Sequence, residues 1–109
     1  MIHQPFGLPA IIFAILAVPL VLGLVPPNRY YGVRTAAAMA SPDVWKRVNR
    51  VAGWGVVAAS GIYAIVARAW PYSRAAPDDG RIWTLHLVSF AVPLFAALIA
   101  AGRYGRKLG

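Results

Sequence analysis

Acidic residues are few and cysteine is absent in this 109-residue chain. It has three aspartates, no glutamate and no cysteine, against 11 lysines and arginines. The missing cysteines exclude disulfides, thiolate metal sites and cysteine nucleophiles. The aspartates, Asp43, Asp78 and Asp79, all lie outside the apolar runs, so the sequence offers no paired carboxylates for acid–base catalysis and no intramembrane carboxylate relay. We therefore expect a protein that is not an enzyme and has neither a cofactor nor a metal site.

Charged residues are also few, at 13%, whereas hydrophobic residues make up 60% and the mean hydropathy is +0.61. Three apolar runs cover residues 8–25, 51–70 and 82–101. At about 1.5 Å per residue, helices of these lengths reach about 27 to 30 Å, enough to cross the hydrocarbon core of a membrane. Strands are not expected because open sheet edges cannot lie in lipid. The sequence predicts an all-α fold, a three-helix membrane bundle forming one domain over residues 1–109.

The second run indicates how such helices would pack. On a helical wheel its small and polar residues share one face, which we expect to meet the other two spans: Ala52, Ala59, Ser60, Tyr63 and Ala67. The bulky residues Trp54, Ile62 and Ile65 lie roughly opposite and should face lipid.

The distribution of basic residues predicts the orientation. Eight lie in the loop 26–50 and the C-terminal tail, which share one side of a three-span protein: Arg29, Arg34, Lys46, Arg47, Arg50, Arg103, Arg106 and Lys107. The other side has Arg68, Arg74 and Arg81, partly offset by Asp78 and Asp79. We expect an inner (cytoplasmic) membrane protein with its N-terminus outside and its loop and C-terminus in the cytoplasm. Because this rule accounts for the positive charge, anionic lipid headgroups are expected partners and nucleic acid is not.

The third run contains His86, the one histidine within a predicted span, on a stripe with Ser89 and Pro93. Polar residues in membrane helices often mark functional sites. The alternative is a structural histidine that bonds to a neighbouring helix or to water.

The loop between the first two runs carries the most specific signals. Pro26-Pro27 should end the first helix, and Asn28 can form a cap or an Asx-turn. Ser41-Pro42-Asp43 is a strong helix start, followed by valines on one side and basic residues on the other. This pattern predicts a short interfacial helix that leads into the second span.

The order of residues in this loop resembles the signature of the SdpI family, a helix ending in prolines, an Asn-x-x-x-Gly-x-Arg-Thr run and a Ser/Thr-started helix with a tryptophan. The residues that carry the resemblance are Asn28, Gly32, Arg34, Thr35, Ser41, Trp45 and Asn49, within a match of about residues 13 to 68. The family is named for an immunity protein that protects a bacterium from its own toxin peptide and signals by holding a repressor at the membrane. The resemblance implies a short, single-module member in which Asn28, Gly32, Arg34, Thr35, Trp45 and Asn49 form a partner-binding site or a structural one. Ala36 departs from the proline that many members carry.

Three functions remain open from the sequence. The first is toxin-peptide resistance or membrane signalling through a bound repressor or toxin peptide. The second is an accessory or structural subunit of a larger membrane complex. The third is a small transporter or channel formed by homo-oligomerisation, for which few intramembrane polar residues are present.

Overall fold

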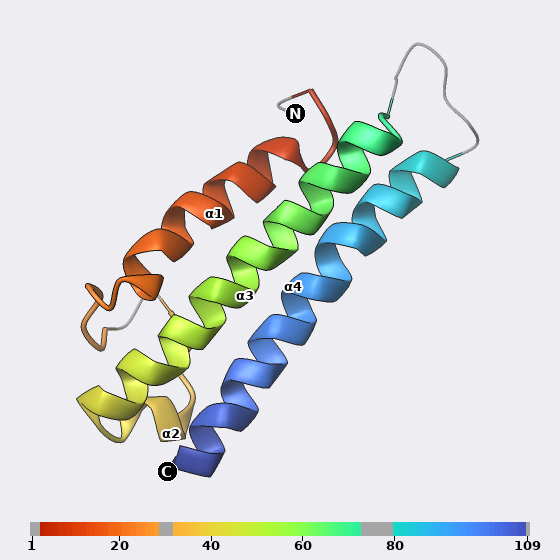
Figure 1. Ribbon diagram of the computed structural model, residues 1–109. Coiled ribbons are helices and arrows are strands. Elements are labelled where there is room, and N and C mark those ends of the chain that lie inside the picture. Colours follow the sequence, from red (N-terminus) through yellow and green to blue (C-terminus); the bar gives the residue numbers. More distant parts are fainter. Residues whose placement is uncertain (1–2, 29–31, 73–79, 109) are drawn as a thin grey trace.

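The computed structural model describes residues 3–28, 32–72 and 80–108, and these residues form four helices and no strand. The helices are α1 (Gly7–Val21), α2 (Ala36–Met39), α3 (Pro42–Ala69) and α4 (Arg81–Leu108). Helix α3 lies between α1 and α4 and packs against both, and the short α2 covers one end of the α3–α4 pair (Figure 1). Arg29, Arg74, Asp78 and Asp79, which contributed to the expected orientation, lie outside the described residues.

Helices α3 and α4 are long and apolar enough to cross a membrane. Each has 28 residues: α3 begins nine residues before the predicted span 51–70, and α4 ends seven residues after the predicted span 82–101. The amphipathic segment after Ser41 is helical, as expected, but it is continuous with α3. Ser41 caps α3 as predicted, because its Oγ accepts from the Val44 N–H at 3.1 Å.

Helix α1 is apolar but has only 15 residues, and it ends at Val21 rather than at Val25 as the prolines suggested. The reason is Gly23, which has a positive φ of 71°. Its N–H donates to the Leu20 carbonyl and the Leu24 N–H donates to the Pro19 carbonyl, the two hydrogen bonds of a Schellman motif. The helix therefore ends at a glycine cap, several residues before the prolines.

The packing face predicted for α3 is confirmed. Ala52, Ala59, Ser60, Tyr63 and Ala67 are all buried, whereas Trp54, Ile62 and Ile65 are exposed. Two glycines permit the close approach. A Cβ on Gly53 would meet the Ala17 carbonyl and Val21 of α1, and a Cβ on Gly55 would overlap Ala97 of α4. Without these side chains the backbones of neighbouring helices can come close together.

Candidate functional site

The connection between α1 and α3 is fastened to α3 by the side chain of Trp45. This residue is only 1% exposed, and its indole N–H donates to the backbone carbonyl of Val25 at 2.8 Å. The ring fills space under the loop, while the hydrogen bond satisfies the one donor that a buried indole carries. Trp45 thus holds the chain where it leaves α1.

Asn49, one turn further along α3, provides the second fastening and is 2% exposed. Its Oδ1 accepts a short hydrogen bond from the Val33 N–H. Its Nδ2 donates to the Val33 carbonyl at 3.2 Å and to the Trp45 carbonyl at 3.1 Å. A side-chain amide can pair with both polar groups of one backbone residue in this way, much as a neighbouring strand would. We call Trp45 and Asn49, with their backbone partners Val25 and Val33, the loop clasp.

Gly32 is required by the geometry of the loop clasp. Its φ is 107°, a left-handed value that favours glycine. A Cβ there would lie 2.7 Å from Asn49 Oδ1 and 3.1 Å from the Trp45 ring. Only glycine allows the backbone to lie directly on these two side chains.

The hydroxyl and amide residues of the loop form local caps. Thr35 Oγ1 accepts from the Ala38 N–H at 3.1 Å and so begins α2. Asn28 Nδ2 donates to the Pro26 carbonyl at 2.8 Å, a local turn after the double proline. Five of the six loop residues singled out in the sequence therefore shape the backbone or lie against it.

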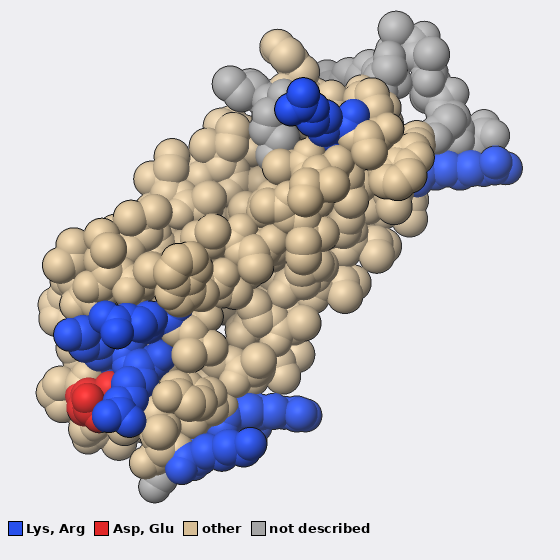
Figure 2. Space-filling model, viewed as in Figure 1, with Lys and Arg blue, Asp and Glu red and all other residues tan. Residues whose placement is uncertain are grey.

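Arg34 is the exception. Its side chain is exposed, and no hydrogen bond or ion pair joins it to any other residue in the described part of the chain. Asp43 pairs with Arg47 at 3.2 Å and not with Arg34. Further basic residues lie at the same end of the molecule, on the start of α3 and the end of α4 (Figure 2). The loop thus presents a cation free to bind an anionic group.

His86 and Ser89 lie elsewhere, and His86 is part of a buried hydrogen-bond chain near the other end of the bundle. Its Nε2 lies 2.7 Å from the Trp70 carbonyl and must donate to it, so its Nδ1 can accept from the Tyr63 hydroxyl at 2.8 Å. That hydroxyl in turn accepts from the Phe6 N–H at 3.0 Å. Ser89 donates to the His86 carbonyl within α4. These hydrogen bonds link α1, α3 and α4 to one another.

Sequence reasoning missed the partners in both networks. The clasp uses the backbone of Val25 and Val33, and backbone groups carry no residue-type signal. Tyr63 was placed on the correct face, but its hydrogen bond to His86 depends on how α3 and α4 align. Among the described residues no group of three or more potential metal ligands gathers.

Comparison with known proteins places the loop within a region matched by a family model. No curated protein and no solved structure matches the chain. The family model described as the SdpI/YfhL protein family matches residues 24–102. The matched range contains the loop clasp, Arg34, α2, α3 and α4 up to residue 102, whereas α1 precedes it. The chain belongs to the SdpI/YfhL protein family.

Proposed function

We propose that this protein crosses the bacterial inner membrane three times, with its N-terminus outside and its loop 26–50 and C-terminus in the cytoplasm. The supporting observation is the exposed surface, which carries large apolar side chains on all three long helices. Examples are Ile15 on α1 at 64% exposure, Ile65 on α3 at 69% and Phe95 on α4 at 62%. An apolar surface of this extent is costly in water but suits lipid.

The charges support the same placement. On the face shown in Figure 2, lysines and arginines lie toward the two ends of the molecule and leave an uncharged middle band. Helix α1 is about 22 Å long at 1.5 Å per residue, so its crossing would also use residues 22–25. The N–H groups of Leu22, Gly23 and Leu24 there are paired with carbonyls of α1, as the interior of a membrane requires. The start of α3 lies at the cytoplasmic interface, where its basic side can meet headgroups.

Within this placement, the protein acts in toxin-peptide resistance or in membrane signalling by binding a partner, without catalysis. The observation that carries this proposal is the family membership, because the match includes the whole loop with its clasp. The clasp fixes the loop backbone, and Arg34 is exposed with no hydrogen-bond or ion-pair partner among the described residues. A rigid loop with a free guanidinium is suited to hold a carboxylate or phosphate of a repressor or of a peptide.

The experiment is a pull-down of the tagged protein from native membranes in mild detergent, followed by mass spectrometry. Three variants accompany the wild type: Arg34→Ala removes the free cation, Asn49→Ala opens the clasp, and Lys107→Ala is a charge-loss control at the end of α4. The proposal expects a soluble repressor-like protein or a small peptide that the wild type and the control retain and that the first two variants lose. Equal recovery from all four proteins would refute binding through the loop.

The alternative is an accessory subunit of a larger membrane complex. One feature favours it: Gly61 lies on the exposed side of α3, where an added Cβ would meet no other atom within 4 Å. A glycine on a lipid-facing surface leaves room for another helix. This function predicts that the wild type and Arg34→Ala recover a large membrane assembly at fixed stoichiometry. Gly61→Leu should lose that assembly.

A further inference from the structure

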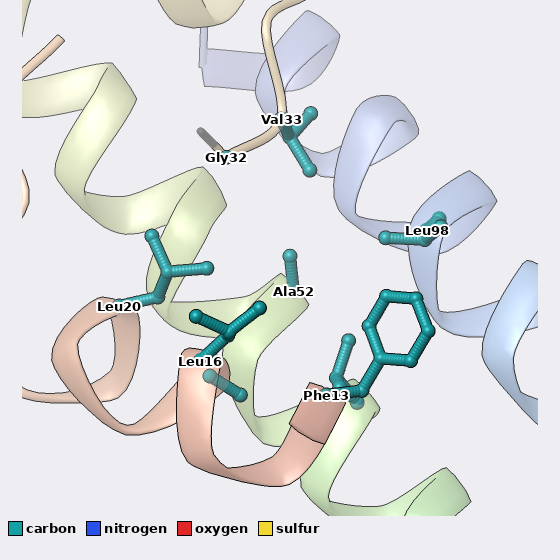
Figure 3. A pocket seen from close by; sticks show the side chains of 9 residues that line it. Phe13, Leu16, Leu20, Gly32, Val33, Ala52 and Leu98 are labelled. Atoms are coloured by element: carbon teal, nitrogen blue, oxygen red, sulfur yellow. The ribbon is translucent and has the colours of Figure 1, made fainter. Parts of the chain in front are cut away.

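An apolar groove of about 210 Å³ opens between α1 and α4 beside the loop clasp. Helix α1 forms one wall, Leu98 of α4 forms the other, and Ala52 of α3 lies between them (Figure 3). Val56 of α3 also lines the groove. Gly32 and Val33 of the loop line the groove across from α1 (Figure 3). The α1 residues that line it are Phe13, Leu16, Ala17 and Leu20.

We propose that this groove holds an acyl chain of an anionic phospholipid whose headgroup phosphate binds Arg34. The inference rests on the membrane placement proposed above but not on any protein partner. The inference adds a defined lipid-binding site to the proposed membrane placement.

The lining of the groove favours an acyl chain over a peptide. Every side chain that lines it is apolar. The backbone N–H and C=O of Val33, which a bound peptide strand could otherwise use, are both paired with Asn49. A peptide in the groove would leave its own backbone groups without partners at a cost of several kcal/mol each in lipid. An acyl chain has no such groups to satisfy.

The charge beside the groove favours an anionic headgroup. Arg34 directly follows Val33 in the chain, so its Cα lies about 3.8 Å from the Cα of a residue that lines the groove. Its guanidinium is exposed and has no partner in the described structure, and guanidinium binds phosphate oxygens in a bidentate manner. Asp43 is the one acidic residue among those described, and it is paired with Arg47. This end therefore carries excess positive charge that a negatively charged lipid would complement.

Native mass spectrometry of the full chain, released from detergent, tests the site. The protein is mixed with palmitoyl-oleoyl phosphatidylglycerol or with the matched phosphatidylcholine, and retained lipid is counted. Leu16→Trp fills the groove, and Ile15→Trp is its matched control, because Ile15 is on the same helix but does not line the groove. Arg34→Gln removes the cation. Lys107→Gln is the charge control, since it lies nine residues beyond Leu98 and thus on the opposite side of α4.

We expect the wild type and both controls to retain phosphatidylglycerol in preference to phosphatidylcholine. Arg34→Gln should lower phosphatidylglycerol binding about fivefold, the effect of roughly one basic residue at a lipid surface, and leave phosphatidylcholine unchanged. Leu16→Trp should lower the binding of both lipids. Circular dichroism and gel filtration confirm that each variant is folded.

Two kinds of result would overturn the proposal. The first is a lack of lipid specificity: the wild type retains the two lipids equally, or Leu16→Trp and Ile15→Trp lose equal amounts of bound lipid. The second is a bound peptide or a second copy of the chain that disappears in Leu16→Trp while lipid binding is unaffected. Because no cellular partner is needed, failure here would leave the proposed partner binding untouched, and failure of the pull-down would leave the lipid site untouched.

Discussion

Substituting Asn49 with alanine should release the loop while α3 and α4 remain packed. The change removes three hydrogen bonds, two of them to Val33, and leaves the Val33 N–H and C=O without their partner. A hydrogen bond contributes about 1 kcal/mol net, and an unsatisfied buried group costs about 1 to 3 kcal/mol. Because Val33 is partly exposed and water can replace some of the loss, we expect about 2 to 4 kcal/mol in total.

Hydrogen exchange in detergent micelles measures this loss residue by residue. If Val33 exchanges through local opening of the loop, its protection should fall about 30- to 700-fold in Asn49→Ala. Amides in the middle of α3, such as that of Ala59, should keep their protection. Lys46→Ala, an exposed change on the same helix, is the control. Unchanged protection at Val33 would show that Asn49 does not hold the loop.

Three other substitutions test separate parts of the structure. Gly32→Ala should destabilise the loop by about 1 to 3 kcal/mol, because of its positive φ, and the effect should shrink in an Asn49→Ala background, which removes the nearest clash. Gly55→Ala should lower the thermal unfolding midpoint, because its Cβ overlaps Ala97, whereas Gly61→Ala on the open side should be neutral or stabilising; equal effects would contradict the assigned packing. His86→Phe should cost about 1 to 3 kcal/mol in a bilayer unfolding assay through the loss of its two hydrogen bonds, and no measurable cost would exclude a structural role.

The sequence predicts the helical class and the packing face of α3 because both follow from composition and the 3.6-residue period. Ser41 was recognisable as a cap because its role depends only on residues within one turn. The end of α1 was misplaced because two stop signals compete there. The glycine at position 23 ends the helix first, and the more conspicuous prolines follow.

The loop clasp could be anticipated only in part. Its side chains were singled out by their resemblance to a family signature, but their partners are backbone groups of Val25 and Val33, 20 and 16 residues away in the chain. Such contacts depend on the three-dimensional path of the loop, which no local pattern specifies. The groove is likewise assembled from α1, α3, α4 and the loop, and its residues are ordinary apolar ones in the sequence.

The most direct test of the account is a map of which residues face each side of the membrane. The chain has no cysteine, so single cysteines can be labelled without background. His3→Cys, Ala36→Cys, Arg81→Cys and Lys107→Cys each place a thiol at an exposed position outside the proposed crossings. A membrane-impermeant maleimide should label the cysteines at 3 and 81 in intact spheroplasts and those at 36 and 107 only after lysis. Labelling of position 36 in intact spheroplasts would contradict a cytoplasmic loop, and equal labelling of positions 3 and 36 before lysis would show that α1 does not cross.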